Sequence, residues 1–132
     1  MDFIKITPDK ERAKSILKMC ELLKKRIALQ DEQEMASLII ADYYEIIKEL
    51  ITALLYTDGY KTISHKNLII YLEKHYSQFS SYEIELINEL RMLRNRIVYE
   101  GFSTNPSYLK RKRKDLEKLI SKLQTLVEEK LK

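Results

Sequence analysis

The stretch from residue 80 to residue 101 reads SSYEIELINELRMLRNRIVYEG, and it carries its own start and stop signals. Ser80 lies three residues before Glu83, which is the spacing of a capping box at a helix N-terminus. Gly101 follows the last apolar residues, and glycine is common just past a helix end because it adopts the left-handed conformation without strain. The stretch therefore predicts one long helix between Ser80 and Gly101.

Similar signals frame a helix on each side of this stretch. Asn105-Pro106 is a cap followed by a first-turn proline, and the apolar residues from Leu109 to Val127 recur at helical spacing up to the C-terminal end of the sequence. On the other side, Ser64 can cap a short helix that stops near Tyr76. The region from residue 64 onward is thus expected to form three helices.

The N-terminal part of the sequence predicts two more helices. Thr7-Pro8 resembles a cap with a first-turn proline and opens a helix from about residue 8 to about residue 29. A second apolar stripe begins near Met35 and ends at Asp58-Gly59, so these two helices should form an antiparallel hairpin. With 132 residues, two glycines and two prolines, we expect a single all-α domain over residues 1–132, an up-and-down four-helix bundle with an additional short helix.

Several classes of protein are disfavoured by composition. No apolar run approaches the roughly 20 residues needed to cross a bilayer, and the first five residues, MDFIK, lack the organisation of a signal peptide, so a cytoplasmic protein is expected. Cys20 is the only cysteine and falls in the apolar stripe of the first helix, which favours a small core residue over a nucleophile. The sequence contains no Gly-rich phosphate loop and no metal-ligand cluster, so neither a cofactor nor a metal is expected.

The formal net charge of +4 permits contact with nucleic acid without establishing it. The densest basic run is Lys110, Arg111, Lys112, Arg113 and Lys114. Five consecutive helical residues point around most of the circumference, so the run makes no single stripe. A solvated face is the first interpretation, and nonspecific attraction to an RNA backbone is the alternative.

Residues 91–99 hold the side chains most suited to chemistry. Arg91, Asn95 and Tyr99 follow one another at four-residue spacing, so they can converge on one surface patch with phosphate-binding potential. Arg94 lies on the apolar stripe of the same helix, where a guanidinium must reach solvent, pair with an acid or enter a subunit interface. Asp42 interrupts the apolar stripe of the second helix, and we hypothesise that it is the supporting acid that pairs with Arg94.

The two histidines, His65 and His75, do not form an obvious site. Ten residues rotate a helix well away from the three- or four-residue spacing that places side chains on one face, so no metal site is expected. His65 follows the probable cap Ser64 and is interpreted as a residue that solvates the helix start.

Residues 93–101, LRNRIVYEG, resemble the terminal-helix motif of HEPN domains, which is normally Arg, often Asn, three further residues and His. Other segments resemble small prokaryotic HEPN proteins in the same order: YEIIKEL at 44–50, ALL at 53–55, GYK at 59–61 and SHK at 64–66. The resemblance implies a helical bundle that often dimerises and brings Arg and His from both protomers into a cleft where RNA is cut without metal. Arg94 and Asn95 match that motif, and Tyr99 stands at the position of the histidine.

The departure at Tyr99 changes what the resemblance implies. A phenol ionises near pH 10, so tyrosine is a poor general base, although it can still donate a hydrogen bond or a proton. Gly101 stands where some family members carry a tyrosine that a nucleotidyltransferase partner modifies. The resemblance therefore implies a homodimeric, catalytically degenerate component associated with RNA or nucleotides, paired with a minimal nucleotidyltransferase in a toxin–antitoxin-type system.

Two alternatives stay open. The first is a metal-independent ribonuclease in which Arg94, Asn95 and Tyr99 act at a dimer cleft, with Arg91, Lys110, Arg111 and Arg113 as further phosphate-binding residues. The second is a structural protein–protein interaction module that uses helix faces to assemble a complex.

Overall fold

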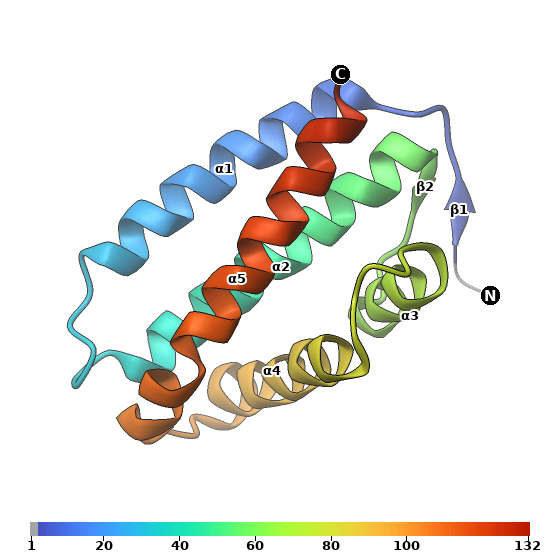
Figure 1. The fold of residues 1–132 in the computed structure, drawn as a ribbon. Helices are drawn as coiled ribbons and strands as arrows, with labels where there is room; N and C mark the ends of the chain where they lie inside the picture. The colour runs from blue at the N-terminus through green and yellow to red at the C-terminus, as the bar shows by residue number, and fades with distance from the viewer. Residues whose placement is uncertain (1–2) are drawn as a thin grey trace.

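The computed structural model describes residues 3–132, and it contains five helices and two short strands (Figure 1). Met1 and Asp2, the first residues of the segment without signal-peptide features, lie outside the described residues. The elements in chain order are β1 Ile4–Lys5, α1 Lys10–Ala28, α2 Ala36–Asp58, β2 Tyr60–Lys61, α3 His65–His75, α4 Ser81–Glu100 and α5 Pro106–Lys130. The all-α prediction is confirmed at this level.

Helix α2 is the central element because it packs against each of the other four helices. Thirteen of its residues are buried, including Leu50 and Leu54, neither of which exposes any surface. Figure 1 shows α1 running antiparallel to α2 on one side, α5 crossing in front of it, and α3 and α4 on the other side. A helix with neighbours on several sides must be apolar around much of its circumference, as the α2 sequence is.

The ends of α3, α4 and α5 agree with the sequence signals. The backbone N–H of Glu83 donates to Ser80 Oγ over 3.1 Å and the N–H of Ser80 donates to the Glu83 carboxylate over 2.9 Å, so both halves of the capping box form. Ser64 and Asn105 accept the expected backbone hydrogen bonds at the starts of α3 and α5. Gly101 ends α4 with a φ of 68°, in the left-handed region.

The start of α1 and the two strands differ from the sequence prediction. The N-cap is Asp9, whose Oδ1 accepts the Arg12 N–H over 2.9 Å, whereas Thr7-Pro8 lies before the helix. Residues 4–9 instead lie along the end of α2: β1 pairs antiparallel with β2, and the Ile6 N–H donates to the carbonyl of Gly59 over 2.9 Å. Strands of two residues are too short to show an alternating pattern, so no sequence signal predicts them.

Gly59 allows this close approach. Its φ of 87° lies in the left-handed region, and a Cβ atom at this position would lie 3.0 Å from the carbonyl oxygen of Ile6. Both the turn after α2 and the contact with the N-terminal segment therefore require glycine.

Two further findings concern Cys20 and the apolar character of the helices. Cys20 lies in the core at 1% exposure, and burial raises the pKa of its thiol to about 12, which agrees with the role of a small core residue. Within residues 3–132, no helix is both long and apolar enough to cross a bilayer.

Candidate functional site

Three of the predicted site residues come together near the end of α4. Arg94 Nη1 donates to Asn95 Oδ1 over 3.1 Å and to the hydroxyl oxygen of Tyr99 over 3.4 Å. Arg94 and Asn95 are half-buried, whereas Tyr99 is 73% exposed. The residues that carry the resemblance in the sequence thus form one hydrogen-bonded group at the surface.

The guanidinium of Arg94 also lies near two aromatic rings. Its Cζ atom is 5.9 Å from the centre of the Tyr44 ring on α2 and 5.6 Å from the centre of the Tyr99 ring. Both distances are within the range of cation–π attraction. Tyr44 is 1% exposed and is fixed by the core, so α2 supplies a rigid support for an arginine on α4.

His65, the first residue of α3, belongs to the same group of side chains. The Tyr44 hydroxyl and His65 Nδ1 form a hydrogen bond of 3.2 Å, and the two ring centres are 5.8 Å apart. The interpretation of His65 as a residue that only solvates a helix start is therefore wrong. Sequence reasoning missed the contact because helical periodicity relates residues of one helix and gives no information on pairs from two helices.

The charges around His65 favour its neutral form. Burial lowers the pKa of His65, and the positive charges of Lys48, Arg94 and Arg91 lower it further, against the opposing effect of Glu45. Burial likewise raises the pKa of Tyr44 to about 12, although Arg91 and Arg94 act in the opposite direction. At neutral pH the site therefore holds a neutral imidazole and a neutral phenol beside two guanidinium groups.

Within the described part of the chain, neither of these guanidinium groups has an acid partner. Arg91 donates through Nε and Nη2 to Asn88 Oδ1, over 3.2 and 3.0 Å, and Arg94 donates to Asn95 and Tyr99 as described above. No ion pair within residues 3–132 includes Arg91 or Arg94. The C-terminal half of α4 thus presents two positive charges whose hydrogen-bond partners within residues 3–132 are neutral oxygen atoms.

The hypothesis that Asp42 pairs with Arg94 is wrong. Both Asp42 oxygens accept from Arg26 on α1, over 3.0 and 2.8 Å, and Oδ2 also accepts from Gln30 over 2.8 Å. Asp42 and Tyr44 are two residues apart, and two residues rotate a helix by about 200°. Asp42 therefore lies on the side of α2 that faces α1, while Tyr44 lies on the side that faces Arg94.

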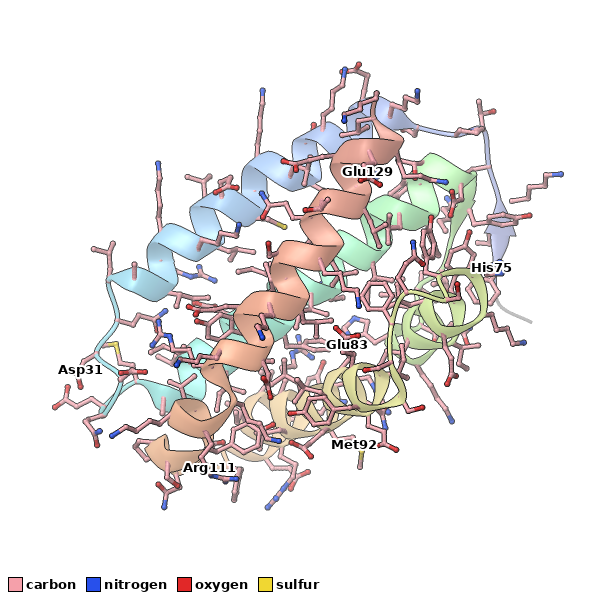
Figure 2. The ribbon with its side chains drawn as sticks, viewed as in Figure 1. Asp31, His75, Glu83, Met92, Arg111 and Glu129 are labelled. Atoms are coloured by element: carbon pink, nitrogen blue, oxygen red, sulfur yellow. The ribbon has the colours of Figure 1, made fainter. Side chains whose placement is uncertain are left out.

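The basic run at the start of α5 divides between several partners. Arg113 forms ion pairs with Glu32 at 2.6 Å and Glu117 at 3.6 Å, and its Cζ lies 5.8 Å from the Tyr43 ring. Arg111 instead lies over Tyr108, and Figure 2 shows it at the lower edge of the molecule.

Two lysines of the run, Lys110 and Lys112, have contacts that differ from those of Arg113. Lys112 Nζ donates to the Tyr82 hydroxyl on α4 over 3.4 Å. Lys110 is exposed and forms no side-chain hydrogen bond within residues 3–132. The prediction that the run makes no single stripe is confirmed, and Arg113 is occupied by acids of the chain itself.

Exposed apolar side chains lie beside Arg94 on α4. Val98, one helical turn after Arg94, is 51% exposed, and Tyr99 adds the larger exposed ring. Met92, two residues before Arg94 and so on another side of the helix, is 55% exposed and points away from the bundle in Figure 2. The positive charges at the end of α4 are therefore accompanied by apolar surface that nothing within residues 3–132 covers.

Comparisons with protein families, curated proteins and solved structures find no match to this chain. Within residues 3–132, no group of three or more His, Cys, Asp or Glu side chains is arranged to hold a metal ion. The chemistry of the site must be argued from its own side chains. Two guanidinium groups, an amide, a phenol and an imidazole form a set suited to binding oxyanions.

Proposed function

We propose that this chain is a HEPN-like, RNA- or nucleotide-associated binding component, and that Arg94 and Arg91 bind phosphate groups. The observation that carries the proposal is the absence of an acid partner for either guanidinium in the part of the chain that is described. An internal ion pair would instead favour a role in fixing the bundle, and Arg26 with Asp42 is an example of that arrangement.

The environment of Arg94 suits an anion supplied from outside. The guanidinium is half-buried, so it has lost part of its hydration, and its contacts within the chain are an amide oxygen, a phenol oxygen and two rings. An arginine held by neutral groups keeps its full charge and several N–H donors. A phosphate oxygen pair would match the forked donors of the guanidinium.

The neighbours of Arg94 favour a nucleotide over a simple inorganic anion. The exposed ring of Tyr99 offers a face on which a base can stack, and stacking on aromatic side chains is a common mode of single-stranded RNA recognition. The side chain of Asn95 can donate and accept hydrogen bonds beside the same guanidinium.

The assembly is also part of the proposal. We infer a homodimer in which an up-and-down HEPN-like bundle contributes the end of α4 to a shared cleft. The exposed side chains of Val98 and Tyr99 beside Arg94 support this arrangement, because apolar surface of that kind is often covered by a partner. The minimal nucleotidyltransferase partner in a toxin–antitoxin-type pair rests on the sequence resemblance alone.

The test is binding of a mixed labelled RNA pool to the wild type, Arg94→Ala and Arg12→Ala at two salt concentrations. Arg12 is the matched control, because it is an exposed arginine on α1 whose guanidinium contacts Tyr56, twelve residues along α2 from Tyr44. We expect Arg94→Ala to weaken binding by about tenfold, consistent with about 1.4 kcal/mol for a charge-assisted contact. Arg12→Ala should stay within about twofold of the wild type. Equal losses in both variants would refute a site at Arg94.

Metal-independent RNA cleavage is the second candidate, and the position of His65 favours it. In this reaction the ribose 2′-oxygen bonds to phosphorus and the bond from phosphorus to the 5′-oxygen breaks. A base accepts the 2′-hydroxyl proton and an acid supplies a proton to the 5′-oxygen. His65 lies in the Arg94 group and is neutral at neutral pH, which is the form that accepts a proton.

The same samples distinguish the candidate functions. Cleavage that is lost in Arg94→Ala and kept in Arg12→Ala would favour the ribonuclease. Salt-sensitive binding without cleavage would favour the degenerate binding component. If neither occurs, the remaining function is a structural interaction module.

A further inference from the structure

His65 has a geometry that its position in the sequence does not explain. Its Nδ1 atom bonds to the Tyr44 hydroxyl, and the same Tyr44 ring lies under the Arg94 guanidinium. No hydrogen bond of His65 Nε2 is formed within residues 3–132. The imidazole is half-buried, so Nε2 is the one polar atom of the ring still available to a ligand beside Arg94.

We propose that His65 is a binding residue of the phosphate site and that it takes up a proton when a phosphate group binds next to Arg94. The inference rests on the proposed function, and it adds a residue from α3 to a site formed by α4. It also predicts that the affinity of the site depends on pH through one identified side chain.

Charges from both helices packed against His65 support the proposal. Helix α2 supplies Lys48 and Glu45, and α4 supplies Arg91 and Arg94. Lys48 pairs with the carboxylates of Glu45 at 2.5 Å and Glu49 at 3.2 Å, so the charges of α2 largely offset one another and the two arginines of α4 supply the positive charge that remains. In the empty site, a proton on His65 would add a further positive charge beside these arginines, which is unfavourable.

A bound phosphate reverses this balance. A phosphodiester brings one negative charge into the group of cations, so the protonated imidazole gains an attractive partner. The pKa of His65, which lies below the ordinary value of 6.5 in the empty site, should therefore rise when phosphate binds. Because the bound form takes up the proton, affinity increases as pH falls through the bound pKa and becomes constant below the pKa of the empty site.

The Tyr44 hydroxyl can serve both forms of the imidazole. Burial keeps Tyr44 protonated at physiological pH, so its O–H can donate to Nδ1 of the neutral ring and its oxygen can accept from Nδ1 of the charged ring. The Nδ1 bond is thereby kept in both states, and Nε2–H is left as the donor for a ligand in the charged form.

The chain provides a matched control, because it contains only two histidines. His75 ends α3, is exposed and packs its ring 4.4 Å from the centre of the Tyr71 ring (Figure 2). Any pH response that depends on histidine must come from His65 or His75. Substituting each one separately identifies the responsible residue.

The experiment measures binding of a short oligouridylate that lacks a terminal phosphate and carries a pH-insensitive rhodamine label. Anisotropy is recorded from about pH 8 to about pH 5 at constant ionic strength for the wild type, His65→Asn, His75→Asn and Arg94→Ala. Asparagine at position 65 keeps a polar group near the place of Nδ1 but cannot take up the proton. As pH falls, the affinity of the wild type and of His75→Asn for the oligouridylate should increase by about tenfold for each pH unit by which binding raises the pKa of His65. His65→Asn should show no such change.

Nuclear magnetic resonance of the wild type tests the same inference without any substitution, so the result does not depend on whether His65→Asn folds. The two histidine ring signals are titrated with and without saturating oligouridylate, and only the His65 signal should shift its midpoint upward. An unchanged midpoint of the His65 signal, or the same pH response in His65→Asn and the wild type, would overturn the inference about His65. The proposed function would still stand in that case if binding were lost in Arg94→Ala. Absence of binding at every pH would remove both.

Discussion

The two sides of α2 place different chemical groups next to an arginine of the neighbouring helix. On the side that faces α1, Asp42 accepts two hydrogen bonds from Arg26 and a third from Gln30. On the side that faces α4, the group next to Arg94 is the ring of Tyr44, and no carboxylate within residues 3–132 forms an ion pair with Arg94. The two arginines differ in the chemistry that α2 offers them, although Asp42 and Tyr44 are only two residues apart.

This difference supports the proposal that Arg26 serves packing and that Arg94 binds a ligand. The chain contains twenty acidic residues, and most of its helices supply acids to nearby cations, as with Lys130 and Asp58 or Lys122 and Glu83. A half-buried guanidinium without such a partner is less stable in the empty protein than one that is paired. Arg94 is half-buried and forms no ion pair within residues 3–132, and an external anion would supply the missing partner.

The largest effect in this comparison is expected from Tyr44. Tyr44→Ala removes a fully buried ring from the contact of α2 with α4 and should lower the free energy of unfolding by about 3–5 kcal/mol. Tyr44→Phe keeps the ring under Arg94 and loses only the bond to His65, so it should cost about 1 kcal/mol. Urea unfolding followed by circular dichroism measures both values. Similar losses in the two variants would mean that the hydroxyl, and not the ring, supports this contact.

A smaller effect separates the two arginines themselves. Arg26→Ala leaves the buried Asp42 carboxylate with Gln30 as its remaining partner and should destabilise the protein by about 1–2 kcal/mol, a value reduced because Arg26 is largely exposed. Arg94→Ala removes no ion pair and should change stability by less than about 0.5 kcal/mol.

The contrast is measured by urea unfolding at low and high salt. Salt should reduce the loss in Arg26→Ala, since it screens the pair in the wild type, and should leave Arg94→Ala nearly unchanged. The double variant with Arg26→Ala and Asp42→Asn is the control, because it removes the unpaired charge and should recover part of the loss. If Arg94→Ala were the more destabilising variant, Arg94 would be a packing residue and the comparison would fail.

Much of the fold could be predicted from the sequence, because helix ends are local. The capping box at Ser80 and Glu83, the cap at Ser64 and the glycine at 101 each act within a few residues, and all three have the predicted geometry. The start of α1 was misplaced because Asp9 competes with Thr7 as a cap, and the pairing of residues 4–9 with the end of α2 decides between them. That pairing is a long-range contact, which local patterns do not record.

The candidate site was predictable in part for the same reason. The four-residue spacing predicted that Arg91, Asn95 and Tyr99 converge, but Arg94 is the arginine that donates to Asn95 and Tyr99, while Arg91 donates to Asn88. The segment was thus predicted correctly, and the arginine that bonds to Asn95 and Tyr99 was not. The contacts between helices were not predictable: Asp42 was assigned to Arg94 on the basis of charge alone, and His65 was left outside the site. The packing of all five helices decides which face of α2 contacts which helix. The sequence pattern identifies the apolar positions but not the residues that they contact.

The smallest effect concerns the basic run at the start of α5, where paired and unpaired cations again lie close together. Arg113 is held by Glu32 and Glu117, whereas Lys110 and Arg111 are exposed and lack acid partners within residues 3–132. The double variant with Lys110→Ala and Arg111→Ala should weaken RNA binding by about twofold at moderate salt and should reduce its salt dependence, because exposed cations contribute through screened attraction to the backbone. Arg113→Ala should leave binding unchanged, since that guanidinium already has its anions. Binding by each variant at two salt concentrations measures this difference, and a loss in the double variant as large as that in Arg94→Ala would move the phosphate site from α4 to α5.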